Sequence, residues 1–131
     1  MIGLDTGFFI ELLNGNEEAA RVWKSGLTDG EEFLVSALTL FEIERLGLKG
    51  KLRDWKIILE AISGAAVIVW LAEDTLSLAA RLSHGLGIPS MDSLILASLV
   101  SGGVAKIFTT DSHFEAYESG KVVVRNLRRE G

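Results

Sequence analysis

Short apolar runs along the chain alternate with longer segments in which apolar residues recur at helical spacing. The runs are apolar nearly throughout, which is typical of strands buried on both faces of a sheet. We expect strands at residues 1–4, 33–36, 67–69, 106–109 and 122–124. The helical spacing predicts helices at residues 6–13, 17–25, 38–46, 52–62, 74–84 and 90–101, and a short helical turn at residues 114–118.

Strands that alternate with helices indicate a parallel sheet covered on both faces. We therefore expect an α/β fold, a three-layer α/β/α sandwich with a central parallel sheet of about five strands. The sequence has no internal repeat, low-complexity tract or linker, so we expect residues 1–131 to form a single domain. Ligands of such sheets bind beyond the carboxyl ends of the strands, and the candidate site is expected there.

Composition narrows the function classes. Hydrophobic residues make up 48% of the chain, yet no apolar run approaches the roughly 20 residues that span a bilayer. An acid at position 5 and the lack of a basic leader predict a cytoplasmic protein without a membrane partner. The absence of cysteine excludes a disulfide framework and a thiolate metal site. A net charge of −5 argues against coating nucleic acid by bulk positive charge.

Two acids follow predicted strands. Asp5 ends the first strand and Asp111 follows the fourth, so a parallel sheet would place both carboxylates at the same edge. Each acid taken alone has a simpler explanation as the cap of a helix or turn. Together they point to a site at this edge.

Two further acids lie where the helical pattern favours apolar residues. Glu42 lies between Leu38 and Leu46 on one helical stripe; a surface pair with Arg45 is the simpler alternative, and Glu44 takes its place if the helix is rotated. Asp92 heads a second apolar stripe, where favourable interaction with the helix dipole is the simpler alternative.

Four carboxylates at one edge repel one another and need protons or cations to neutralise them. Oxygen ligands without cysteine or paired histidines favour Mg²⁺ or Mn²⁺, as one or two ions. Such ions activate water and stabilise the leaving oxygen during displacement at phosphorus. The four acids therefore predict hydrolysis of a phosphodiester.

Basic residues after Glu42 are candidate contacts to nucleic-acid phosphates, with a solvated helix face as the alternative. They are Arg45, Lys49, Lys51 and Arg53, with Arg125, Arg128 and Arg129 as a weaker second group. His84 and His113 receive no role, since neither has a second histidine at ligand spacing. The tryptophans are expected in packing or dimer contacts, with base stacking as the alternative for Trp55.

Four pieces in this order resemble the PIN-domain family of metal-dependent ribonucleases, which includes the toxins of VapBC-type toxin-antitoxin pairs. The pieces are DT at 5–6, SALTLFE at 36–42, IPSMDSLI at 88–95 and TTDSHF at 109–114. The resemblance covers essentially the whole chain and implies a PIN-like fold, cleavage of RNA, Mg²⁺ or Mn²⁺ dependence, frequent homodimers and, for a toxin, an antitoxin partner.

The resemblance assigns the family's catalytic and metal-binding quartet to Asp5, Glu42, Asp92 and Asp111, with Thr6 and Thr109 as supporting hydroxyls. Two departures concern glycines: Gly7 replaces a frequent hydroxyl, and Gly47 lies one residue late, which keeps Glu44 as an alternative ligand. The alternatives in function are a non-toxin PIN nuclease of RNA processing and a non-catalytic binding module. A phosphate-accepting receiver or a haloacid-type phosphatase is disfavoured, because Asp5 lacks a second neighbouring acid.

Overall fold

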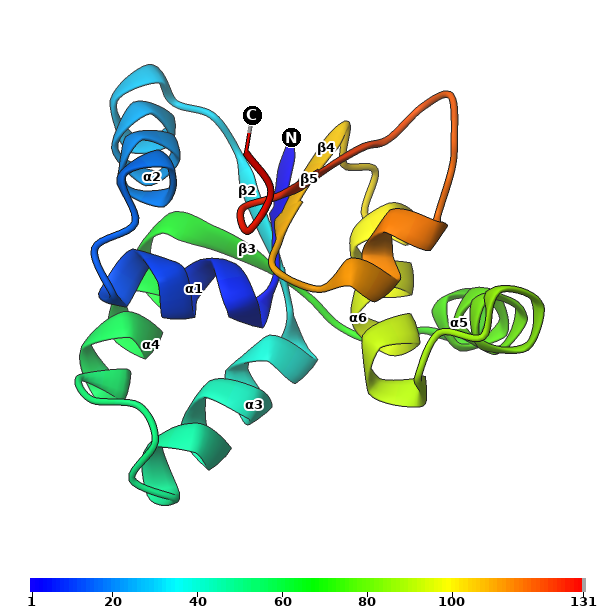
Figure 1. Ribbon diagram of the computed structural model, residues 1–131, viewed down its shortest axis with the longest axis horizontal. Helices are drawn as coiled ribbons and strands as arrows, with labels where there is room; N and C mark the ends of the chain where they lie inside the picture. The colour runs from blue at the N-terminus through cyan, green and yellow to red at the C-terminus, as the bar shows by residue number, and fades with distance from the viewer. Residues whose placement is uncertain (131) are drawn as a thin grey trace.

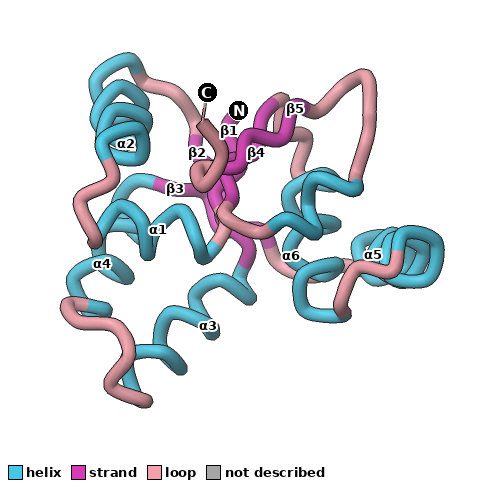
Figure 2. Tube along the Cα trace, viewed as in Figure 1, coloured by secondary structure: helices cyan, strands magenta, loops and turns pink. Residues whose placement is uncertain are grey.

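The computed structural model describes residues 1–130, which form a parallel sheet between helices (Figures 1 and 2). The strands are β1 (Ile2–Leu4), β2 (Phe33–Ser36), β3 (Ala66–Val69), β4 (Lys106–Thr109) and β5 (Val123–Asn126). The helices are α1 (Thr6–Leu13), α2 (Glu17–Asp29), α3 (Ala37–Leu48), α4 (Trp55–Ala65), α5 (Glu73–Leu86), α6 (Ser90–Ser101) and the 3-10 helix η1 (Ser112–Ala116).

The five strands lie in the order β3-β2-β1-β4-β5 and every pairing is parallel. Side chains alternate between the two faces along β2: Phe33 and Val35 join one buried cluster, and Leu34 joins the other. The first cluster packs under α1 to α4 and the second under α5 and α6, on opposite sides of the sheet (Figure 1). The predicted three-layer α/β/α fold is confirmed.

Several helix boundaries differ from the prediction by one to four residues, and the end of α2 and the start of α4 have clear physical reasons. Helix α2 continues past Ser25 to Asp29 and ends at Gly30, whose φ of 73° closes the helix in the left-handed region. Gly26 stays inside α2, where the Phe33 ring lies so close that a Cβ would approach it to 2.0 Å. Helix α4 begins at Trp55 rather than residue 52, because Asp54 has a φ of 57° that no helix continues through.

The tryptophans divide between the interior and the surface. The Trp23 ring stacks on Phe33 with centroids 5.0 Å apart. Trp55 packs on Gly47, where a Cβ would lie 2.2 Å from the ring, so Gly47 permits a close contact between α3 and Trp55 instead of ending α3. Trp70 is 72% exposed, so the prediction of packing within the chain is wrong for this residue; a dimer contact stays a prediction.

Candidate active site

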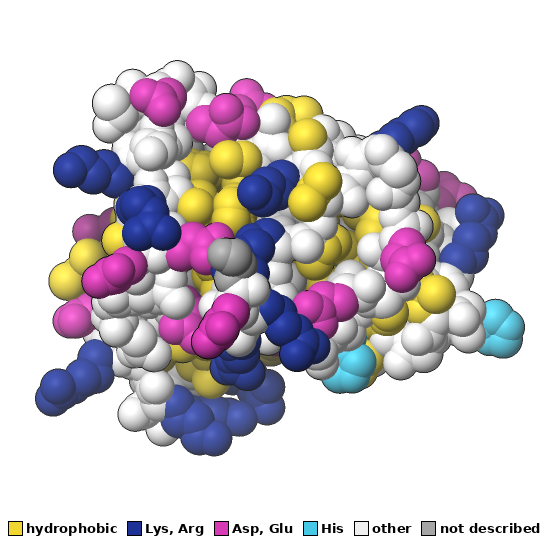
Figure 3. Space-filling view, turned by 45° about the horizontal axis from the view of Figure 1, so that its top comes forward, with side chains coloured by type: hydrophobic (Ala, Val, Ile, Leu, Met, Phe, Trp, Pro, Cys, Tyr) yellow, Lys and Arg dark blue, Asp and Glu magenta, His cyan; other side chains and the backbone are white. Residues whose placement is uncertain are grey.

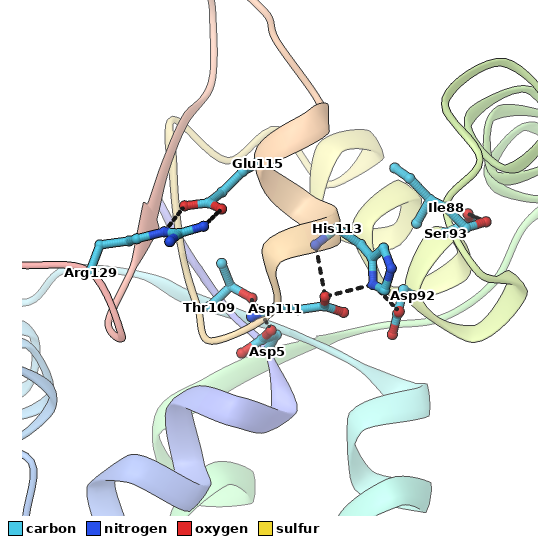
Figure 4. Close-up of polar contacts among 9 residues, drawn as sticks. All are labelled: Asp5, Ile88, Asp92, Ser93, Thr109, Asp111, His113, Glu115 and Arg129. Carbon is cyan, nitrogen blue, oxygen red and sulfur yellow. Dashed lines mark hydrogen bonds and ion pairs between the residues drawn. The ribbon is translucent and has the colours of Figure 1, made fainter.

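The four predicted acids line one cavity of about 380 Å³, at the edge where the strands end. Asp5 follows β1 and Asp111 follows β4, as the parallel topology requires. Glu42 reaches the cavity from α3, and Asp92 reaches it from the first turn of α6. Three of these acids, Asp5, Asp92 and Asp111, are labelled in Figure 4. The structure therefore brings together acids from four separate segments.

Asp5 is the most deeply buried acid of the cavity, with 5% of its surface exposed. One of its oxygens accepts a hydrogen bond from the Phe8 amide at 3.0 Å, so the expected cap of α1 is also present. The other oxygen accepts a hydrogen bond from the Thr109 hydroxyl, which in turn accepts from the Asp111 amide at 2.9 Å. The Thr109 hydroxyl thus ties Asp5 to the segment that carries Asp111.

Burial raises the pKa of the Asp5 carboxyl from 3.8 to about 7. Hydrogen bonds from Thr109 and Phe8 oppose this rise in pKa, and the negative charges of Asp111 and Glu42 add to it. Ionising a carboxyl group in this buried position costs free energy unless a cation lies beside it. The cavity therefore favours a positively charged ligand.

Asp92 and Asp111 share a partner that the sequence analysis left without a role. The His113 Nδ1 lies 2.9 Å from Asp111 Oδ1 and 3.4 Å from Asp92 Oδ2 (Figure 4). The pKa of Asp92 is raised to about 6, first by burial and then by its hydrogen bond to Asp111 and the Asp111 charge, while His113 lowers it. The sequence feature that could have identified His113 is its position two residues after Asp111, since an aspartate side chain commonly contacts the residue two positions later in a turn.

Thr6 holds Glu42, the fourth acid of the cavity, in place. Its hydroxyl donates to Glu42 Oε1 at 2.6 Å and so connects the start of α1 to α3. Glu44 is exposed and lines a different cavity, on another face of α3. The geometry favours Glu42 over Glu44 as the acid of α3 in the site.

The presence of glycine instead of a hydroxyl residue at position 7 also has a structural reason. A Cβ at position 7 would come within 1.9 Å of the Thr110 hydroxyl oxygen, so the Thr110 side chain fills the space of the side chain expected there. Both residues line the acidic cavity. A hydroxyl is therefore supplied from the segment after β4, in place of the one missing after Thr6.

The basic residues have unequal surroundings. Arg125 pairs with Glu18 at 2.7 Å and Arg129 pairs with Glu115 at 2.9 Å, whereas Arg128 lines the acidic cavity. Arg45, Lys49, Lys51 and Arg53 are exposed. Figure 3 shows basic and acidic side chains interspersed over one face, with Lys and Arg gathered along its lower edge. Of the weaker group of arginines, only Arg128 lies at the cavity.

The donor set of the cavity fits a hard divalent cation. Carboxylate oxygens predominate, and the chain has no cysteine to recruit a softer ion. Asp92, Asp111 and His113 each offer one ligand atom, and these atoms lie within 4.8 Å of one another. The expected Mg²⁺ or Mn²⁺ is therefore compatible with these residues.

Comparison with known proteins agrees with this arrangement. The PIN domain profile matches residues 2–119. No curated protein matches the sequence. No helix in residues 1–130 has both the length and the apolar character that crossing a membrane requires.

Solved structures share the fold at low sequence identity. A chain of a toxin-antitoxin complex from Klebsiella pneumoniae is 18% identical with a TM-score of 0.72, covering 94% of this chain and 96% of that chain. A chain of VapBC2 from Rickettsia felis, bound to a DNA fragment from its promoter, is 16% identical with a TM-score of 0.72, covering 96% and 98%. A chain of FitAcB from Neisseria gonorrhoeae is 25% identical with a TM-score of 0.67, covering 97% and 98%.

The profile match extends over nearly the whole sequence, and its range contains all four acids of the cavity. The sheet order and the position of the acids at the carboxyl edge are in accord with it. The chain belongs to the PIN domain family, a family of nucleases.

Proposed function

We propose that this chain is, as a single domain, an endoribonuclease that hydrolyses RNA phosphodiester bonds with Mg²⁺ or Mn²⁺. The observation that carries the proposal is the convergence of four acids on one cavity at the carboxyl edge of the sheet. These acids, Asp5, Glu42, Asp92 and Asp111, are the catalytic and metal-binding residues of the proposal. One or two bound ions would supply an activated water and neutralise the leaving oxygen.

The chain itself contributes position and charge. Asp5 is fixed by Phe8 and Thr109, and Glu42 is fixed by Thr6, so neither carboxylate has to be ordered when the substrate binds. Arg128 at the cavity would bind a phosphate of the RNA backbone, since its two neighbouring arginines are engaged by acids. Arg45, Lys49, Lys51 and Arg53 would extend the phosphate contacts beyond the cavity.

We further propose that the protein is the toxin of a type II toxin-antitoxin pair. The support is the similarity to chains of the Klebsiella pneumoniae toxin-antitoxin complex, of VapBC2 and of FitAcB over nearly their whole length. The proposal includes a homodimer in the cytoplasm, to which the exposed Trp70 side chain would contribute apolar surface.

A second cavity of about 610 Å³ offers a place for the antitoxin. It is lined by Leu40, Phe41, Leu48 and Leu59, and Leu48 is 73% exposed. Apolar lining of this kind suits a protein segment better than RNA. Arg45 and Lys49 border the same cavity, so an acidic antitoxin segment would pair with them and compete with RNA for these residues.

The nuclease proposal is tested by cleavage of labelled RNA and of DNA of the same sequence, with Mg²⁺ or Mn²⁺ and with chelator. We expect cleavage of RNA only, and only with metal. Asp92→Asn should lower the rate by at least about a hundredfold, because one charged ligand is lost. The matched control is Asp74→Asn, since Asp74 also lies in the first turn of a helix but is exposed and outside the cavity.

Wild-type activity in Asp92→Asn, in folded protein, would refute the assignment of the site. Two alternatives give different results in the same set of assays. A non-toxin nuclease of RNA processing would cleave RNA without arresting growth on expression. A binding module would bind RNA or protein and cleave nothing with either metal.

A further inference from the structure

The imidazole of His113 lies against Asp92 and Asp111, two of the four acids that line the cavity (Figure 4). Its Nδ1 is 2.9 Å from Asp111 Oδ1 and 3.4 Å from Asp92 Oδ2. The backbone amide of His113 also donates to Asp111 Oδ1, at 2.8 Å. This turn fixes the start of the His113 side chain and directs its Nδ1 toward both carboxylates.

The separations between these atoms match those of neighbouring ligands around one ion. In an octahedral site with ligands about 2.1 Å from the ion, adjacent ligand atoms lie roughly 3 Å apart. Each of Asp92, Asp111 and His113 offers an atom within 4.8 Å of the other two. The His113 Nδ1 therefore lies where a third ligand beside the two carboxylates would lie.

The exposure and the two nitrogens of the His113 ring suit the role of a metal ligand. The His113 side chain is 51% exposed, so the ring reaches both the carboxylates and water. In the neutral imidazole one nitrogen carries the proton and the other has a free lone pair. With the proton on Nε2, hydrogen-bonded to solvent, the lone pair of Nδ1 is available to an ion between Asp92 and Asp111.

We propose that His113 is a ligand of the ion bound by Asp92 and Asp111 and that its nitrogen makes the site select Mn²⁺ over Mg²⁺. Mg²⁺ strongly favours oxygen ligands, whereas a transition metal gains from an imidazole nitrogen. Four carboxylates alone would accept either ion. The inference rests on the proposed metal site and adds a determinant of which metal occupies it.

Calorimetric titration of Mn²⁺ and of Mg²⁺ into the metal-free protein tests the selectivity. We expect tighter Mn²⁺ than Mg²⁺ binding in the wild type. His113→Ala should weaken Mn²⁺ binding at least about tenfold, the lower end of what disturbed metal surroundings cost, and change Mg²⁺ binding less than about twofold. The matched control is His84→Ala: His84 is the other histidine of the chain, is exposed on α5, and should alter neither affinity.

A spectroscopic measurement tests the ligand directly, and its first result needs only the wild-type protein. Pulsed electron paramagnetic resonance of the Mn²⁺-loaded wild type should show coupling to a directly bound nitrogen. The coupling should change when histidine is isotopically labelled, persist in His84→Ala and vanish in His113→Ala.

Two results would overturn the role of His113 while leaving the proposed function intact. One is a wild-type Mn²⁺ complex with no nitrogen coupling. The other is an equal loss of Mn²⁺ and Mg²⁺ binding in His113→Ala, which would indicate a positioning role without selectivity. A wild-type protein that binds neither ion would instead refute the metal-dependent function itself, and with it this inference.

Discussion

Without metal, the folded state should lose stability as the pH rises from about 5 to about 8, through the buried carboxyl of Asp5. Its pKa is about 7 in the folded protein against 3.8 ordinarily, with 5% of the residue exposed. The folded state therefore holds a proton that the unfolded chain releases. The resulting stability is fully present below a pH of about 4 and is lost as the pH rises through about 7.

The magnitude follows from the difference in pKa. A difference of about three units at 1.36 kcal/mol per unit gives a total loss of up to about 4 kcal/mol between pH 4 and pH 8, of which about 3 kcal/mol falls above pH 5. Asp92, with its pKa raised to about 6, acts in the same direction. Glu18 and Glu115 have lowered pKa values beside Arg125 and Arg129, so their stabilisation is lost only as the pH falls below their ordinary value of 4.5. The range above about pH 5 therefore isolates the raised pKa values.

Urea unfolding in the presence of a chelator, at about pH 5, 6.5 and 8, measures the effect for the wild type and for Asp5→Asn. Asparagine can still accept from the Phe8 amide but cannot ionise. We expect Asp5→Asn to gain stability relative to the wild type by up to about 3 kcal/mol between pH 5 and pH 8, because only about two pH units of this interval lie below the folded pKa of Asp5. A difference between the two proteins that stays constant from pH 5 to pH 8 would refute the reasoning.

Three further predictions concern metal, packing and substrate. Mn²⁺ at one fixed concentration, 100 times its Kd at pH 8, should raise the free energy of unfolding by about 2.7 kcal/mol at pH 8. The same concentration should raise it by clearly less at pH 5, where protonation of the carboxylates weakens binding. Equal effects in unfolding measurements at the two pH values would contradict the carboxylate site. Gly47→Ala should lower the free energy of unfolding by about 1–3 kcal/mol, because a Cβ would meet the Trp55 ring. Gly64→Ala, in the open part of α4, should raise the free energy of unfolding by up to about 1 kcal/mol. Stabilisation by both substitutions would contradict the packing argument. Arg128→Gln should raise KM for RNA several-fold with little change in kcat. The control Arg81→Gln should change neither constant, because Arg81 is an exposed residue of α5 outside the cavity. An unaltered KM in Arg128→Gln would remove Arg128 from substrate binding.

The sequence allowed the sheet and the grouping of the acids to be predicted from short-range information. Apolar runs locate the strands, and the carboxyl ends of parallel strands share one edge, which places Asp5 near Asp111. The helical period places Glu42 and Leu46 on one stripe, and both line the cavity. Asp92 follows from the same argument on α6.

Contacts between distant segments could not be predicted in this way. His113 meets Asp92 only because η1 packs beside α6, and nothing near either residue in the sequence records that contact. Arg125 and Glu18 are 107 residues apart, so the sequence could not separate this paired arginine from Arg128 at the cavity. The predicted helix ends at residue 46, before Gly47, because the close approach of Gly47 to Trp55 depends on how α3 and α4 pack.

The most direct test of the account is anomalous X-ray diffraction from crystals grown with Mn²⁺, since it locates the ion without reference to any assay. We predict a peak in the acidic cavity, about 2.2 Å from carboxylate oxygens of Asp92 and Asp111, with Asp5 in the same cluster of ligands. An empty cavity at a saturating Mn²⁺ concentration, or an ion bound only outside the cavity by an active nuclease, would contradict the account.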